Sequence, residues 1–358
     1  SYICGAVVVT KDPETGVRNV GWYRLTQLWQ CRHPTDGSYT ERQQKQQLSI
    51  FAFWNPPMNH FGLHLAKAKA AGKPLEVAVA KLCDPAIHVA ACTGTPFGMD
   101  EYKFAGGLRG SPVEVVKCDT VDLEVPATAE WVIEGVFQPD ADDVTIGWRS
   151  NSVGYYDKLQ IFPVFDIKRI THRRNPLWYA TIEMMPPFDH NYLALMPVEG
   201  EVLSDLQRKI PEVNDVVVTP NMTYIVQLKV DGAQKPHPEF AKFVLHEVWG
   251  AAGRWGRTAK LVVVVGPDIN PYDLTAVEFA IGSRVQPYED SIMNQSAQAF
   301  VLDPSAAKGP QGFPMTGSQL GIDATIKIPE RFTDYAPVSQ AAPEEVAAIG
   351  EKLRGVLD

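Results

Sequence analysis

Polar residues near the start of the chain have types and spacings that suit a chemical site. They are Asn19, Arg24, His60, His64 and Glu101. His60 and His64 lie four positions apart in a run whose apolar residues recur at helical spacing, so both side chains project from one helix face. Two imidazoles in that arrangement are able to hold a metal ion. Alternatively, one histidine begins the helix and the other is packed or at the surface, and a short motif leaves both interpretations open.

Asn19 and Arg24 lie in a run of residues typical of a strand. Because they are five positions apart, a regular strand directs their side chains to opposite sides. A shared site therefore requires a bend or bulge between them, and we expect Gly21 to provide it. Residue types and spacing identify these side chains as candidates for a site, but they do not indicate a particular function.

The first half of the sequence predicts mostly β-structure with two helices. A turn rich in charged residues, Pro and Gly at residues 11–16 separates two strand-like runs, which indicates a hairpin. One helix is expected from Asn59 to Ala71, and a second begins at Pro85 with Asp84 as its cap. Strands are expected over residues 3–9, 17–25, 48–54, 75–80, 113–118, 130–137, 159–171 and 177–184.

The pattern changes after about residue 190, where strands begin to alternate with helices. Helices are expected over residues 238–252 and 273–285, and strands over residues 216–218, 224–230 and 260–266. Such alternation favours a three-layer α/β domain with some parallel pairing. Residues 303–322 are rich in Gly, Pro and Ser and predict a long loop, and an amphipathic helix is expected over residues 343–357.

Composition excludes several classes of function. A net charge of −9 and a pI near 5.4 argue against a nucleic-acid partner, which requires basic patches. No apolar run is long enough to cross a bilayer, so no membrane partner is expected. The five cysteines include no Cys-x-x-Cys pair, which argues against a disulfide framework and a thiolate zinc site. We therefore expect a cytoplasmic protein.

Longer motifs occur in order along nearly the whole chain. They include Asp-Pro-Glu-Thr-Gly-Val-Arg-Asn-Val-Gly-Trp-Tyr-Arg at 12–24, Val-Val-Lys-Cys-Asp-Thr at 115–120, Gly-Tyr-Tyr at 154–156, Leu-Asp-Pro-Ser at 302–305 and Gly-Ile-Asp-Ala-Thr at 321–325. Together these motifs resemble the UbiD family of reversible decarboxylases, which use a prenylated flavin. We expect that the amino-terminal α/β segment of the family is absent from this sequence.

The resemblance implies an α+β fold built from two domains and a tail. A split β-barrel that binds the flavin is expected over residues 1–195. An α/β oligomerisation domain of three layers follows over residues 196–335, and a helical tail over residues 336–358.

The resemblance also implies a prenylated FMN cofactor with a divalent metal, Mn²⁺ or Mg²⁺, bridging its phosphate. Asn19, His60 and Glu101 match the family's metal ligands. A hard cation accepts carboxylate and amide oxygen, and Mn²⁺ also tolerates imidazole. A potassium ion is expected beside the backbone carbonyls of residues 90–93. Relatives often carry a lysine that faces the flavin phosphate where this chain has Gln319, and Lys308 or an arginine is expected to compensate.

Arg24 matches the arginine that contacts the substrate carboxylate, for which a guanidinium has the required bidentate geometry. Relatives flank it with two glutamates, and an acid must return a proton to the carbon that carbon dioxide leaves. This chain has Ile146 and Asn151 at those two positions. Isoleucine cannot ionise, and an amide only forms hydrogen bonds. The replacement acids are expected among Asp189, His190 and Glu183.

Two functional interpretations remain open from the sequence. In the first, the chain carboxylates or decarboxylates an aromatic, phenolic acid, with carbon dioxide as the second partner, and forms a homo-oligomer. In the second, it is a catalytically degenerate subunit of a hetero-oligomer of UbiD-like chains, such as phenylphosphate carboxylase. A flavin reductase is the weaker third interpretation, because no Gly-x-Gly-x-x-Gly fingerprint follows a strand.

Overall fold

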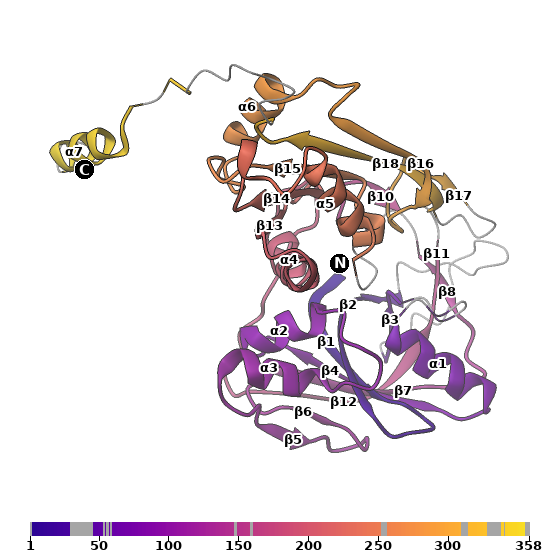
Figure 1. Ribbon diagram of the computed structural model, residues 1–358. Helices are drawn as coiled ribbons and strands as arrows, with labels where there is room; N and C mark the ends of the chain where they lie inside the picture. Colours follow the sequence, from indigo (N-terminus) through magenta and orange to yellow (C-terminus); the bar gives the residue numbers. More distant parts are fainter. Residues whose placement is uncertain are drawn as a thin grey trace.

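The computed structural model describes residues 2–28, 46–52, 54, 57, 59–146, 149–157, 160–251, 256–308, 314–327, 338–339 and 341–354. Figure 1 shows a barrel domain below a second domain that is built around an open sheet, with helix α4 between them. Helix α7 (Pro343–Leu353) lies apart from both domains. None of the described helices is long and apolar enough to cross a membrane.

Six strands of the first domain close into a barrel in the order β1-β2-β3-β12-β7-β4. All of its neighbouring strands run antiparallel. Their bounds are β1 (Tyr2–Lys11), β2 (Arg18–Gln27), β3 (Gln47–Ile50), β4 (Leu75–Lys81), β7 (Trp131–Phe137) and β12 (Val164–His172). The β1–β2 hairpin around the Pro/Gly turn confirms the prediction for the start of the chain.

Three helices pack on the barrel and bury opposite faces of its strands. Helix α1 (His60–Ala70) packs on the face that includes Val8 and Val79. Helices α2 (Pro85–Cys92) and α3 (Glu101–Arg109) cover the other face. Three short pairs complete the domain: β5 (Val115–Lys117) with β6 (Glu124–Pro126), β8 (Val144–Ile146) with β11 (Gln160–Phe162), and β9 (Arg149–Ser150) with β10 (Tyr156–Asp157).

The second domain is a mixed sheet between two layers of helices. Its strands follow the order β13-β14-β15-β18-β16, with β17 paired to β18, and the pairs β14–β15 and β15–β18 are parallel. Their bounds are β13 (Val213–Val218), β14 (Thr223–Leu228), β15 (Leu261–Val265), β16 (Ser291–Gln298), β17 (Ala307–Lys308) and β18 (Pro314–Ala324). Two 3₁₀ turns span Gly232–Gln234 and Gly256–Thr258.

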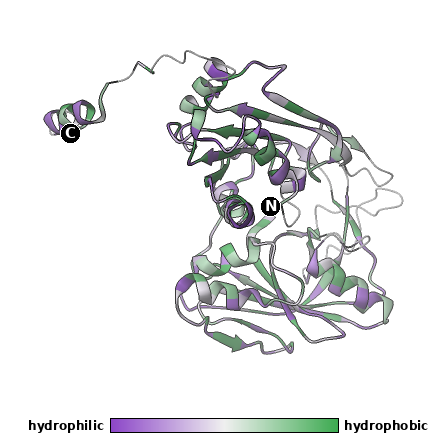
Figure 2. Cartoon of the chain, viewed as in Figure 1, coloured by the Kyte–Doolittle hydropathy of each residue, from purple (hydrophilic) through white to green (hydrophobic). Residues whose placement is uncertain are grey.

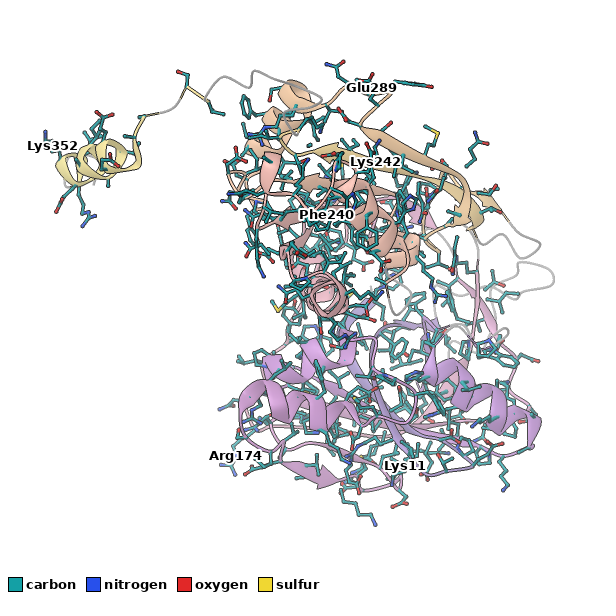
Figure 3. The ribbon with its side chains drawn as sticks, viewed as in Figure 1. Lys11, Arg174, Phe240, Lys242, Glu289 and Lys352 are labelled. Carbon is teal, nitrogen blue, oxygen red and sulfur yellow. The ribbon has the colours of Figure 1, made fainter. Side chains whose placement is uncertain are left out.

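Alternate residues of these strands bury opposite faces of the sheet. Helices α4 (Asp189–Lys209) and α5 (Phe240–Trp249) cover the face that holds Val262 and Val264. Helix α6 (Leu274–Arg284) covers the face that holds Val263 and Val265. The apolar colouring of the strands in Figure 2 follows this arrangement. On α5, labelled in Figure 3, Phe240 is buried whereas Lys242 forms an ion pair with Glu239 at 2.6 Å. The three-layer α/β prediction is confirmed.

The expected loop over residues 303–322 is wrong, because it contains most of β18, a strand inside the sheet. The glycines of this segment made it resemble a loop in the sequence, but in the structure Gly321 allows a helix to pack closely on the strand. A Cβ on Gly321 would lie 2.8 Å from Leu245 and 3.0 Å from Trp249, so a residue without a side chain lets α5 approach the sheet. Helix α4 and strand β16 were not predicted.

The strand expected over residues 177–184 is also wrong, because this segment has no regular strand. Its side chains, rather than a ladder of backbone hydrogen bonds, hold it to the barrel. Trp178 and Tyr179 stack near the Lys81 ammonium, and Glu183 pairs with Arg24. The apolar and aromatic composition that suggested a strand therefore reflects these contacts.

Candidate active site

Two capped helices place His60 and Glu101 at their first positions. The Asn59 side chain accepts a hydrogen bond from the Gly62 amide at 2.8 Å, so α1 begins at His60. Asp100 accepts one from the Tyr102 amide at 3.0 Å, so α3 begins at Glu101. Because an N-cap fixes where a helix starts, both caps also fix the positions of these two side chains.

The Glu101 carboxylate is buried against β2. It accepts hydrogen bonds from the Val20 amide and the Thr95 hydroxyl, both at 2.8 Å. Burial raises the pKa of Glu101 above its ordinary value, while the bonds from Thr95 and Val20 oppose that shift. The Val20 contact brings Glu101 beside Asn19, its neighbour on β2.

Asn19 and His60 approach the same region from the other side of the hairpin. Asn19 pairs directly with Thr10, so their side chains share one face. Thr10 in turn bonds the His64 ring on α1 at 3.0 Å. The His60 ring meets Phe97 edge to face at 5.1 Å, and Phe97 lies on the loop between Thr95 and Glu101.

The donors fit a hard cation. The Asn19 side-chain amide is buried, and its nitrogen has no hydrogen-bond partner among the described residues. The assignment of amide oxygen and nitrogen is interchangeable, so a metal–oxygen bond there would relieve that cost. Each Glu101 oxygen keeps a second lone pair for a metal. In the described part of the chain, no three His, Cys, Asp or Glu side chains form a metal cluster by themselves, so the amide is essential to this set.

His64 has a structural environment that differs from that of His60. Its Nε2 lies 3.9 Å from the buried Asp12 carboxylate, which also accepts a hydrogen bond from Lys67 at 2.8 Å. Burial lowers the pKa of His64 to about 4, although the Asp12 charge opposes the shift, so His64 is neutral at neutral pH. It fastens the β1–β2 turn onto α1, which accounts for the second histidine of the pair.

Arg24 forms a second cluster further along β2. Its Nη1 donates to the Ser150 carbonyl at 2.7 Å and forms an ion pair with Glu183. Its guanidinium carbon also lies 5.5 Å from the centre of the Phe51 ring. The Arg24 and Glu183 side chains are only 19% and 7% exposed, so this ion pair is largely shielded from water. Of the acids proposed from the sequence, Glu183 is the one with a described contact to Arg24.

A bulge on the neighbouring strand lies opposite Arg24. Register shifts between the pairs Ala6–Tyr23 and Ile3–Leu25, so two residues of β1 oppose one of β2. Gly5 lies in this bulge with a φ of +64°, a conformation that favours glycine. The expectation that Gly21 provides the bend is wrong, because Gly21 pairs regularly with Val8. Its missing side chain instead makes room for the Tyr23 ring.

Ile146 and Asn151, the two positions at which the resemblance implied glutamates, have structural roles here. Ile146 is buried in an apolar cluster with Val144 and Phe162. The Asn151 side-chain oxygen Oδ1 accepts hydrogen bonds from the backbone amides of Val153 and Tyr155, both at 3.1 Å, and so holds the turn that follows β9. Asn151 is thus close in sequence to the Ser150 carbonyl that contacts Arg24, but its oxygen organises the loop.

Among the other predicted site residues, Asp189 and Gln319 have described contacts with partners outside these two clusters. His190 lies in the first turn of α4, and its side chain is outside the described part of the structure. Asp189 shares a hydrogen bond with Tyr179. Gln319 lies in the second domain, where it donates to the Arg257 carbonyl at 2.7 Å and accepts from Asn294 at 3.1 Å. The side chain of Lys308, the expected compensating charge, also lies outside the described residues.

Sequence reasoning missed a buried lysine near the Arg24 end of the barrel. Lys81 donates to the Cys4 carbonyl, and its ammonium lies 5.3 Å from the Trp178 ring and 5.0 Å from the Tyr179 ring. Burial lowers its pKa to about 8. The sequence did contain a signal for this residue, because Lys81 ends the apolar run Leu-Glu-Val-Ala-Val-Ala-Lys. A lysine continuing a buried strand is unusual, since charged residues are rarely fully buried.

Comparison with known proteins identifies the family. The model of the 3-octaprenyl-4-hydroxybenzoate carboxy-lyase Rift-related domain matches residues 1–186, and that of the carboxy-lyase C-terminal domain matches residues 191–324. The chain belongs to the UbiD family. This confirms the resemblance seen in the motifs. The closed barrel and the following α/β domain match the architecture of solved UbiD-class structures.

Several relatives share both domains. An uncharacterized protein of Archaeoglobus fulgidus is 34% identical over 99% of this chain and 69% of its own length. The UbiD-class enzyme HmfF from Pelotomaculum thermopropionicum, solved with FMN, is 30% identical over 96% of this chain and 70% of that one, with a TM-score of 0.79. Vanillic acid decarboxylase from Sedimentibacter hydroxybenzoicus, in open form, is 27% identical over 99% of this chain and 70% of that one, with a TM-score of 0.78.

Proposed function

We propose that this UbiD-family protein is a carboxy-lyase that reversibly decarboxylates an aromatic, phenolic acid with prenylated FMN and a divalent metal. The observation that carries this function is the Arg24–Glu183 pair, a shielded guanidinium in contact with a carboxyl group. Relatives support the cofactor: HmfF was solved with FMN, and an evolved dimeric form of HmfF was solved with prenylated FMN.

The two clusters have a separation that suits an extended cofactor. Asn19 and Arg24 are five residues apart on β2, which corresponds to roughly 16 Å at the rise of a strand. The labelled Lys11 in Figure 3 marks the barrel end beside the Asn19 cluster, away from the second domain. Residues at that end would hold the metal and the phosphate of the cofactor, and Arg24 lies toward the other end of the same strand.

The residues of the chain then have distinct tasks. Asn19, His60 and Glu101 would hold the metal, and Arg24 would hold the substrate carboxylate. Prenylated FMN, when bound, supplies an electron sink for that ring. Phe51 shields one side of the guanidinium, and a drier site strengthens its attraction for a carboxylate. A potassium ion near the carboxyl end of α2 belongs to the same proposal, because helix C-termini favour cations.

The metal site is tested by His60→Ala and Glu101→Ala. Each variant removes one of three protein ligands, so we expect bound Mn²⁺ and bound flavin to fall together by at least about tenfold. Metal content is measured by elemental mass spectrometry and flavin by visible absorbance. Exposed His237→Ala and Glu114→Ala are matched controls that should keep both. Stoichiometric flavin in His60→Ala and Glu101→Ala would reject this site.

A second candidate function is a supporting subunit in a hetero-oligomer of UbiD-like chains. Two observations favour it: Ile146 is packed in an apolar cluster, and Gln319 is engaged within its own domain. The Glu183 carboxylate on Arg24 favours the first function instead, because a degenerate site has no need for a shielded acid. Isolation of a colourless chain only together with other UbiD-like chains would favour the supporting role.

A further inference from the structure

We propose that Glu183 is the acid that protonates the carbon from which carbon dioxide leaves. We further propose that Glu183 takes up this proton when the substrate carboxylate displaces it from Arg24. This inference rests on the proposed function and deepens it. The acid comes from the irregular segment between β12 and α4, and not from Ile146 at the end of β8 or Asn151 after β9.

Geometry selects Glu183 among the nearby acids. It contacts the guanidinium that would receive the substrate carboxylate, and its side chain is 7% exposed. Asp189 is instead bonded to Tyr179, and its charge faces Lys81. The amide of Asn151 cannot serve as an acid. Among the acids whose side chains the structure describes, Glu183 is therefore the one in contact with Arg24, the residue that would hold the substrate carboxylate.

The resting ion pair explains how the proton is acquired. Without substrate, Arg24 neutralises the Glu183 carboxylate. A substrate carboxylate that takes the guanidinium places two anions around one cation in a shielded site. The two carboxylates repel each other beside one guanidinium, which favours proton uptake by one of them. Glu183 is that one, because it loses its contact with Arg24 at the same moment. Substrate binding and proton loading are thereby a single event.

The bond between ring carbon and carboxylate breaks, carbon dioxide leaves, and the electron pair stays with the ring carbon. Glu183 transfers its proton to that carbon, which forms the new C–H bond. The Glu183 carboxylate returns to Arg24 as the product departs, so one proton from water is consumed per turnover. In the carboxylation direction Glu183 accepts the proton.

The first test measures proton uptake upon ligand binding. Benzoate, an aromatic carboxylate without the phenolic hydroxyl, is titrated into the holoenzyme by calorimetry in buffers of different ionisation enthalpy. We expect about one proton taken up per benzoate bound by the wild type and none by Glu183→Gln. Glu124→Gln is the matched control: it alters another ion pair of β2, Arg18–Glu124 at 2.8 Å, and should retain the uptake. Equal uptake in wild type and Glu183→Gln would overturn the proposal.

The second test separates bond cleavage from protonation. Vanillate and 4-hydroxybenzoate are supplied to the holoenzyme with ¹³C-bicarbonate. Exchange of label into the acid requires only reversible loss of carbon dioxide, whereas product formation requires the proton. In Glu183→Gln we expect product formation to fall by at least about a hundredfold with exchange retained, and Glu183→Asp to recover part of it.

The outcomes distinguish this inference from the function on which it rests. Equal loss of exchange and product in Glu183→Gln and Glu183→Asp would show a structural role and reject Glu183 as the acid. Undiminished product formation in both variants would reject it as well, while leaving the carboxy-lyase function intact. A wild-type holoenzyme that neither exchanges label nor forms product would overturn the proposed function, and the role of Glu183 with it.

Discussion

Buried charge distinguishes the residues around the proposed site. Arg24 and Glu183 form an ion pair, whereas Lys81 lies nearby and contacts a backbone carbonyl and two aromatic rings. An ammonium taken out of water costs free energy that carbonyl and ring contacts only partly offset. Lys81 thus anchors Trp178 and Tyr179, and with them the segment that carries Glu183, at the expense of stability.

The cost of Lys81 predicts a dependence of stability on pH. Its pKa falls from 10.5 to about 8 in the folded protein, so between these values the unfolded chain binds more protons than the native one. The free energy of unfolding therefore gains a contribution that rises with pH in this window. We expect the stability advantage of Lys81→Met over wild type to shrink by about 2 kcal/mol from neutral pH to about pH 10.

Urea unfolding at both pH values measures this difference. Lys103→Met, on the exposed face of α3, is the control whose difference from wild type should stay constant. A constant difference for Lys81→Met as well would mean that Lys81 is equally charged in the folded and unfolded states.

At the scale of elements, the sequence predicted the helices and strands whose apolar residues recur at regular spacing. It missed the segment that is held in place by contacts of individual side chains. Helix α1 and strand β4 follow apolar spacing, and the Asp84 cap is confirmed by its bond to the Ala86 amide at 2.9 Å. Strand β18 was hidden by glycines. The segment around Glu183 was mistaken for a strand because its aromatic residues bind a distant lysine, a contact that spacing cannot reveal.

The candidate site was predicted mainly through family resemblance. Spacing alone put Asn19 and Arg24 on opposite faces, and the structure does give them separate clusters. The spacing could not show that Glu183 contacts Arg24, because 159 positions separate the two residues. Nor could it assign His64, whose role depends on the buried Asp12 carboxylate.

One glycine limits how the barrel closes. Gly135 of β7 pairs with Ile167 of β12, and an added Cβ would lie 2.5 Å from both the Asp166 carbonyl and the Phe165 ring. The backbone of β12 cannot move away from this Cβ without breaking hydrogen bonds between β7 and β12. We therefore expect Gly135→Ala to lower the free energy of unfolding by about 1–3 kcal/mol.

The control for this substitution lies in helix α3. An alanine at Gly107 would meet no atom within 4 Å, so Gly107→Ala should be neutral or stabilise by up to about 1 kcal/mol. Urea unfolding compares the two. A Gly135→Ala variant as stable as the wild type would show that β7 and β12 separate easily.

For the whole molecule, the barrel carries both clusters and the second domain contributes a separate core. The Asn19 and Arg24 clusters occupy the two ends of one strand, so cofactor and substrate positions are set by a single rigid element. The segment with Glu183 leads directly into α4, the helix that lies between the domains in Figure 1. Any movement of the second domain would reach the proposed acid through this connection.

The central claim is that this chain releases carbon dioxide from an aromatic acid by means of Arg24 and a prenylated flavin. The most direct measurement follows vanillate and 4-hydroxybenzoate in D₂O with the flavin- and Mn²⁺-loaded protein, using mass spectrometry of the product. We predict a decarboxylated phenol with one deuterium at the vacated carbon, and at least about a hundredfold less of it from a folded, flavin-loaded Arg24→Ala variant. Equal product from wild type and Arg24→Ala, or none from a fully loaded wild type, would contradict the account.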